Sequence, residues 1–236
     1  MLSAIAIVPS APVMVPELAG AAAAELSGLR DAVFTAAAAL PQRWLAVGVG
    51  PADATVPADS VGTFAGYGVD VRVRLAPHPG PDGPGWNGQQ PTELPLCALI
   101  TGWVRGQAAP HARAEVRVCA ADLPAPAARD RGRALRAEID RSAEPVGVLL
   151  VADGANTLTP SAPGGHDPDS VPIQRALDDA LAAGDTAALT DLPGAIVGRA
   201  AYQLLTGLVE PAPRSARELY RGAPYGVGYF TGLWTP

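Results

Sequence analysis

The residues with the clearest chemical potential follow one apolar run in the middle of the chain. Asp153, Asn156 and Thr157 come directly after residues 146 to 151, a continuous apolar segment that predicts a strand buried on both faces. Strands of this kind end at the sheet edge where α/β proteins bind their ligands. A carboxylate, an amide and a hydroxyl at such an edge can bind a polar small molecule, and the carboxylate can also transfer a proton. We therefore expect a candidate site here.

The segment after Asp153 is a long loop rich in Pro and Gly that continues to Pro168. Such loops on rigid strands are more often functional than plain turns. His166 lies in this loop and is a candidate ligand contact or acid–base group, although a histidine that only hydrogen-bonds the backbone is the simpler interpretation. Asp153 has a turn role as its alternative, and Asn156 and Thr157 can equally cap a turn or a helix.

Two other predicted strand ends carry polar residues that can reach the same edge. Ser10 follows the apolar run 2 to 8, and Asp53 follows the run 43 to 49. Ser10 stands outside a GxSxG elbow, so we expect a ligand contact or a plain loop serine rather than a nucleophile. The segment ending at Asp53 lacks the third glycine of a dinucleotide fingerprint. Tyr225 can stack on an aromatic ligand, with packing in the core or between subunits as its alternative.

Alternating strand and helix patterns position these residues. The sequence predicts strands over residues 2–8, 43–49, 69–75, 114–119, 146–151 and 223–230, and helices over 17–40, 95–104, 129–141, 170–183, 185–192 and 194–208. A mobile loop is expected over 77–91. The alternation predicts an α/β fold: a single domain over residues 1–236 with a mostly buried central sheet flanked by helices.

Composition narrows the classes of partner. The net charge is −6 and no block of Lys or Arg occurs, which argues against nucleic acid and acidic membranes as partners. Cys97 and Cys119 lie in apolar surroundings and suit packed thiols of a cytoplasmic protein. The N-terminal segment resembles neither a signal peptide nor a membrane span. We expect a small-molecule ligand, and self-association into a homo-oligomer stays open.

Four segments give the chain a resemblance to a known family. They are the proline loop from Pro9 to Glu17, the helix opening Leu94-Pro95-Leu96, the stretch DGANTLTPSAPGGHDP from Asp153, and APYGVGYF from Ala223. Together they resemble the B-type chains of the class III extradiol ring-cleavage dioxygenases, especially an actinobacterial branch, and more distantly the Memo proteins. The resemblance implies an α/β domain with a cleft at the strand ends. In that cleft two histidines and a carboxylate hold Fe(II), and a further histidine is the acid–base group.

The histidines that the resemblance implies are absent from the matching positions. Ser10 stands at the position of the first ligand, Asp53 ends the segment where the second is expected, and Asn156 replaces the acid–base histidine. Hydroxyl and amide groups do not replace imidazole as Fe(II) ligands, and Asn does not titrate near neutral pH. We therefore expect no metal and no cofactor.

The leading hypothesis is a dioxygenase fold without its iron site that binds a small molecule or catalyses a metal-independent reaction. The predicted catalytic residues are Asp153, Asn156 and His166, and the predicted ligand contacts are Ser10, Asp53, Thr157 and Tyr225. One alternative is a divergent oxidoreductase in which Asp53, Asp153 and His166 hold Fe(II) and act on a catechol. Another is an interaction protein that assembles through its C-terminal aromatic residues.

Overall fold

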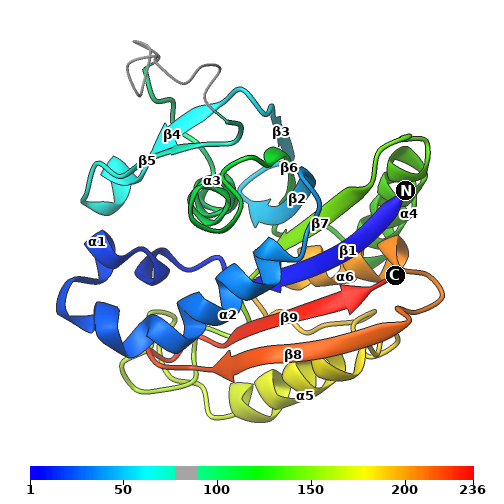
Figure 1. The fold of residues 1–236 in the computed structure, drawn as a ribbon. Coiled ribbons are helices and arrows are strands. Elements are labelled where there is room, and N and C mark those ends of the chain that lie inside the picture. The colour runs from blue at the N-terminus through cyan, green and yellow to red at the C-terminus, as the bar shows by residue number, and fades with distance from the viewer. Residues whose placement is uncertain (78–89) are drawn as a thin grey trace.

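A mixed sheet of seven strands forms the centre of the fold (Figure 1). The computed structural model describes residues 1–77 and 90–236. The strand order is β3-β6-β2-β7-β1-β9-β8. In chain order the strands are β1 (Leu2–Val8), β2 (Arg43–Gly50), β3 (Ala54–Val56), β6 (Arg113–Ala120), β7 (Val146–Val151), β8 (Ser215–Gly222) and β9 (Tyr229–Thr235). The four strands from β6 to β1 are parallel, whereas β3 is antiparallel to β6, β9 to β1, and β8 to β9.

The predicted central strand is confirmed as β7. It pairs in parallel with β1 on one side and with β2 on the other. All six of its residues are buried. A strand with parallel neighbours on both edges and helices on both faces has no wet side, which explains its continuous apolar sequence.

Helices cover both faces of the sheet (Figure 1). The helices are α1 (Pro16–Ala19), α2 (Ser27–Ala38), α3 (Leu96–Ala108), α4 (Ala125–Asp140), α5 (Ser170–Ala183) and α6 (Arg199–Leu208). Side chains of α2 and α3 form one apolar cluster with the sheet, and those of α4, α5 and α6 form a second cluster on the opposite face. The predicted α/β class, with a central sheet flanked by helices, is confirmed.

Several predicted elements differ from the structure. The predicted helix over 17–40 is interrupted. The α1 helix ends at Ala19, because Gly20 has a φ of 55° and leaves the helical region, and a 3₁₀ segment, Gly20–Leu26, precedes α2. The region 185–192 forms turns, the first of which is capped by the Asp185 carboxylate, which accepts hydrogen bonds from the Ala187 and Ala188 amides. Residues 223–228 are the turn between β8 and β9, where Gly226 has a φ of 73°.

The segment predicted as a strand over 69–75 is shorter and lies outside the main sheet. Only β5 (Arg72–Arg74) is extended, and it pairs with β4 (Val61–Thr63) in a separate two-stranded sheet. A 3₁₀ turn, Phe64–Tyr67, joins the two strands. Most of the loop predicted over 77–91, including His78, lies outside the described residues.

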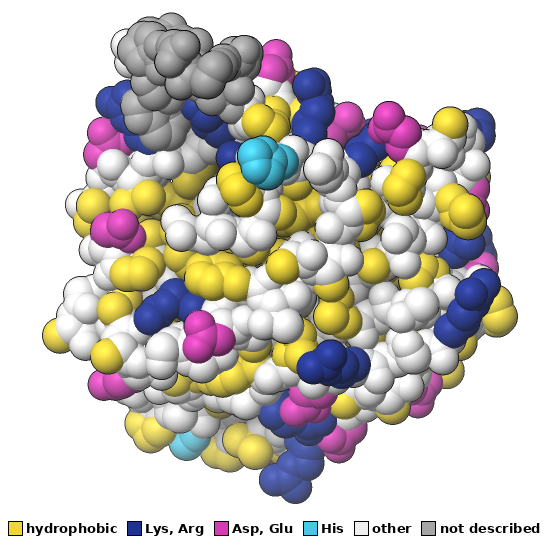
Figure 2. All heavy atoms as spheres, viewed as in Figure 1, with side chains coloured by type: hydrophobic (Ala, Val, Ile, Leu, Met, Phe, Trp, Pro, Cys, Tyr) yellow, Lys and Arg dark blue, Asp and Glu magenta, His cyan; other side chains and the backbone are white. Residues whose placement is uncertain are grey.

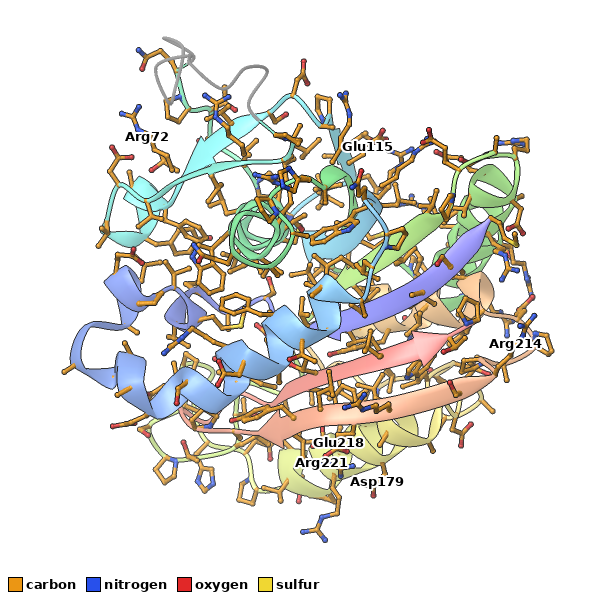
Figure 3. All side chains as sticks on the ribbon, in the orientation of Figure 1. Arg72, Glu115, Asp179, Arg214, Glu218 and Arg221 are labelled. Carbon is orange, nitrogen blue, oxygen red and sulfur yellow. The ribbon has the colours of Figure 1, made fainter. Side chains whose placement is uncertain are left out.

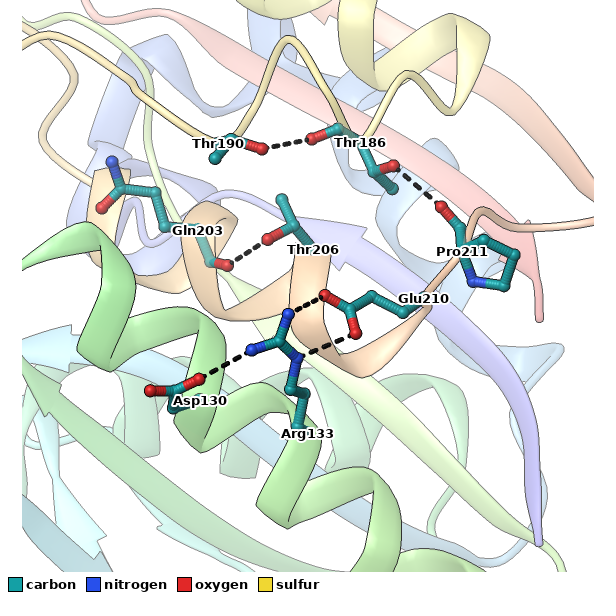
Figure 4. A network of polar contacts seen from close by, with 8 residues as sticks. All are labelled: Asp130, Arg133, Thr186, Thr190, Gln203, Thr206, Glu210 and Pro211. Atoms are coloured by element: carbon teal, nitrogen blue, oxygen red, sulfur yellow. Dashed lines mark hydrogen bonds and ion pairs between the residues drawn. The ribbon is translucent and has the colours of Figure 1, made fainter.

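Two glycines let α4 and α6 pack with their backbones in close contact. A Cβ atom at Gly132 would collide with the Leu204 carbonyl oxygen, and one at Gly207 would collide with the Arg129 carbonyl oxygen. Beside this contact, Arg133 on α4 pairs with Asp130 and with Glu210, which follows α6 (Figure 4). The exposed ion pairs contribute little, so close backbone packing is the main stabilising feature.

The surface mixes charges of both signs. In Figure 2, basic side chains alternate with acidic ones over the visible face, among apolar and polar groups. Cys97 and Cys119 are buried free thiols, as predicted. Within the described ranges, no helix is long and apolar enough to cross a membrane.

The glycines of the helix contact yield a first prediction. We expect Gly207→Ala to destabilise the protein by about 2 kcal/mol or more, because the obstacle is backbone that cannot rotate away. Gly106→Ala is the matched control: Gly106 is exposed in α3 with open space around it, so alanine should leave the stability unchanged or raise it by up to about 1 kcal/mol. Urea unfolding of both variants measures this, and equal stabilities would contradict the close-contact argument.

Candidate active site

The candidate site begins where β1 and β7 end. Val8 lies opposite Val151 in the parallel pair, so the loops after both strands leave the sheet at the same edge. There the backbone amide of Ser10 donates a hydrogen bond to Asp153 Oδ1 at 2.7 Å. Ser10 itself is buried, with 9% of its surface exposed. The structure therefore brings two of the predicted site residues into direct contact.

The Asp153 carboxyl group has an unusual protonation equilibrium. Its burial raises its pKa from about 4 to about 7, against the opposing effect of the Ser10 amide, which favours the carboxylate. Among the described residues, Oδ2 has no hydrogen-bond partner. Near neutral pH the group is thus divided between acid and carboxylate, and it can either donate or accept a proton.

Two buried tyrosines lie near this carboxyl group. The Tyr202 hydroxyl, from α6, donates a hydrogen bond to the Ala152 carbonyl oxygen at 2.9 Å. Tyr229, at the start of β9, is 4% exposed. Burial raises the pKa of both phenols, and the nearby Asp153 charge raises it further. Both stay neutral at physiological pH, and the Tyr229 hydroxyl has no hydrogen-bond partner within the described part of the chain.

Gln174, a residue that the sequence did not single out, holds the start of the loop after β7. Its Oε1 atom accepts a hydrogen bond from the Ala155 amide at 2.7 Å, and its Nε2 atom donates to Asp178 Oδ1 at 2.8 Å. A Cβ atom at Gly154 or at Gly228 would collide with the Gln174 side chain. The pairing of Gln174 and Asp178 at i and i+4 in a predicted helix was the available signal, but such pairs are common on exposed helix faces.

The other predicted residues of this loop have structural contacts. The Asn156 carbonyl oxygen accepts a hydrogen bond from the Gly164 amide at 2.9 Å, which closes the loop on itself. Thr157 Oγ1 donates to the Ser170 hydroxyl at 2.7 Å and so joins the loop to the start of α5. His166 is exposed. The structure thus places Asn156 and Thr157 in the framework of the loop.

Asp53 and Tyr225 are held by other partners. Both carboxylate oxygens of Asp53 accept hydrogen bonds from Arg131, at 2.5 and 2.6 Å, and Oδ1 also accepts one from the Ala120 amide. These contacts, chiefly the one with Arg131, lower the pKa of Asp53 to about 2. Tyr225 donates a hydrogen bond to Glu25 at 3.1 Å. Asp53 therefore belongs to an ion pair beside α4.

The residues do not fit the iron site that the resemblance implies. Within the described ranges, no group of three or more His, Cys, Asp or Glu side chains is arranged to hold a metal ion. Asp53, Asp153 and His166 are consequently not gathered into one site. A non-haem Fe(II) centre needs imidazole and carboxylate ligands that converge on one point.

The raised pKa of Asp153 predicts a specific dependence of stability on pH. Because the folded state binds this proton more tightly than the unfolded state, the stabilising effect is complete below about pH 4 and is lost as the pH rises to about 7. The Asn side chain of Asp153→Asn cannot ionise. The difference in unfolding free energy, variant minus wild type, should therefore increase from about pH 4 to about pH 7, by at most about 4 kcal/mol. Urea unfolding at several pH values measures the difference.

Asp122→Asn is the control for that series, because Asp122 is an exposed carboxylate that follows β6 at the same edge of the sheet. Its stability should follow that of wild type at every pH. A difference between Asp153→Asn and wild type that does not change with pH would contradict the raised pKa.

Comparison with known proteins supports the fold. No protein-family model matches the chain, and no curated protein matches it by sequence. Among solved structures, it is similar to the uncharacterised protein JW3007 of Escherichia coli K12, with a TM-score of 0.54 and 10% sequence identity. The match covers 99% of this chain and 100% of that one. At this identity the similarity establishes a shared α/β architecture over the whole chain.

Proposed function

We propose that the protein binds a small polar or aromatic molecule at the ends of β1 and β7 and transfers a proton with Asp153 as the acid–base group. The observation that carries this proposal is the Asp153 carboxyl group, whose pKa is about 7 and whose Oδ2 atom has no hydrogen-bond partner among the described residues. General acids and bases work best when their pKa lies near the working pH.

The proposed ancestry is the class III extradiol dioxygenase fold without its iron. Ser10, Asp53 and Asn156 occupy the positions where the resemblance implies histidines. The pairing of Asp53 with Arg131 supports this assignment, since a carboxylate already bound by a guanidinium group is a poor metal ligand. A metal-independent reaction in the retained site accounts for these replacements together.

The reaction class that suits the site is proton abstraction from a carbon next to a carbonyl group. Asp153 Oδ2 accepts the proton, and the Ser10 amide stabilises the carboxylate form through Oδ1. The neutral Tyr229 hydroxyl donates a hydrogen bond to the carbonyl oxygen, where negative charge develops. Return of the proton from Asp153 to another atom of the substrate completes an isomerisation, so atoms and electrons balance without a further reactant.

Exchange of hydrogen for deuterium in D₂O tests this proposal. We expect NMR to detect exchange at the α-carbon of some members of a panel of small enolisable ketones and keto acids, with a rate that rises around pH 7. Asp153→Asn should reduce the rate by a factor of about 100 or more. Tyr229→Phe should reduce it less, and Asp122→Asn should leave it unchanged. Absence of both exchange and binding across the panel would contradict the proposal.

Metal loading tests the metal-independent part separately. Wild type, Asp153→Ala and His166→Ala are incubated anaerobically with Fe(II), Mn(II) or Zn(II), desalted and analysed for metal. We expect well below one equivalent in every preparation. Near-stoichiometric metal in wild type that is lost in both variants would instead establish the oxidoreductase alternative.

A further inference from the structure

A cavity of about 330 Å³ lies between α5 and the end of β8, behind the loop that carries Asp153. We call it the α5 cavity. Five polar side chains line it: Gln174, Arg175 and Asp178 from α5, Arg221 from β8, and Thr159 from the loop after β7. Its volume is at the lower end of the range of small-molecule pockets, roughly 300–1,000 Å³. The cavity is therefore large enough for a compact metabolite.

Asp178 presents an incompletely satisfied carboxylate to this cavity. The residue is 9% exposed, and its Oδ1 atom accepts the hydrogen bond from Gln174. Its Oδ2 atom has no hydrogen-bond partner within the described ranges. Burial raises the pKa of Asp178 to about 6, so at neutral pH the carboxylate form predominates. A buried carboxylate of this kind favours a cationic ligand.

The two arginines of the cavity differ in how far their charge is compensated. Arg221 binds Glu218 and Asp179, and Figure 3 shows these three residues grouped where β8 runs beside α5. Arg175 makes no hydrogen bond or ion pair with any described residue. The cavity wall thus carries groups of opposite charge: Arg175, and Asp178, whose carboxylate form the nearby Arg221 also favours.

We propose that the α5 cavity is a second small-molecule site that binds a compact zwitterion, namely an α-amino acid with a small aliphatic side chain. The ammonium group binds Asp178 Oδ2, and the carboxylate binds the Arg175 guanidinium group. Leu158 and Val171, which also line the cavity, contact the aliphatic side chain. The proposal uses residues separate from Asp153 and does not depend on the reaction proposed there.

The Asp178 carboxylate is positioned by a hydrogen bond within the protein. Gln174 binds Asp178 through Nε2 and the Ala155 amide through Oε1, and Gly154 and Gly228 enclose its side chain. The carboxylate is therefore held in place by the same residue that holds the loop after β7. Such preorganisation lowers the entropy that binding would cost.

Calorimetric titration with three related probes tests the assignment. L-valine carries both charges, isobutylamine only the positive one and isovalerate only the negative one. We expect L-valine to bind at least about tenfold more tightly than either half. Equal affinity for isovalerate would indicate a simple anion site, and equal affinity for isobutylamine a simple amine site. Either result, or no binding of any probe, would overturn the proposal.

Two conservative variants assign the contacts. Asp178→Asn keeps an oxygen that can accept the hydrogen bond from Gln174, and Arg175→Gln changes an exposed side chain, so both should fold. Each should weaken L-valine binding about tenfold or more, whereas Arg214→Gln, at the other end of β8 (Figure 3), should not change it. Unchanged binding in Arg175→Gln or Asp178→Asn would refute the assigned contacts.

The deuterium exchange proposed for Asp153 is measured in the same variants. This measurement distinguishes a wrong assignment of the α5 cavity from a wrong assignment of the Asp153 site.

Discussion

The hydrogen bond from the Ser10 amide to Asp153 depends on the parallel pairing of β1 with β7, and the candidate site depends on that bond. Parallel register brings the ends of two strands that are 143 positions apart in sequence to the same edge. One carboxylate oxygen is then bound by a backbone donor whose position the sheet determines. The half-buried carboxyl group has no cation among the causes of its pKa shift. A nearby guanidinium would lower this pKa, as Arg131 does for Asp53.

The loop after β7 is stabilised by close packing of glycines against one amide side chain. The Gly154 amide donates a hydrogen bond to the Gly228 carbonyl oxygen, and the Gly228 amide donates one to the Ala155 carbonyl oxygen. A Cβ atom at either glycine would collide with the Gln174 side chain. A buried glutamine normally loses hydrogen bonds to water, but both ends of this amide have protein partners. The interaction connects α5 to the loop that carries Asp153. It also explains why a long loop with several prolines has a defined conformation beside the sheet.

Much of the fold could be predicted from local pattern, and much of the site could not. The apolar run of β7 and the helix that ends at Gly184 have clear periodic and stop signals, and both were predicted correctly. The turn at 223–228 was mistaken for a strand, because alternating small and large residues suit both structures until Gly226 adopts a positive φ. The surroundings of Asp153 could not be predicted from the sequence for another reason. A backbone amide leaves no trace in residue type, and Tyr202 and Gln174 come from helices whose approach is set by tertiary packing.

Among the residues of the candidate site, Asp153 is the one whose pKa lies near neutral pH. His111 and His166 are both exposed, so neither provides a buried imidazole within the described part of the chain. Asn156 cannot ionise, and the contact with Arg131 keeps Asp53 ionised at any physiological pH. Asp153 can titrate there because burial disfavours its charge. The burial that raises this pKa also lowers the stability of the folded protein above about pH 4. An Asn at this position would avoid that loss of stability. The position of this carboxyl group, at the edge where α/β folds bind ligands, is the one that the proposed proton transfer requires.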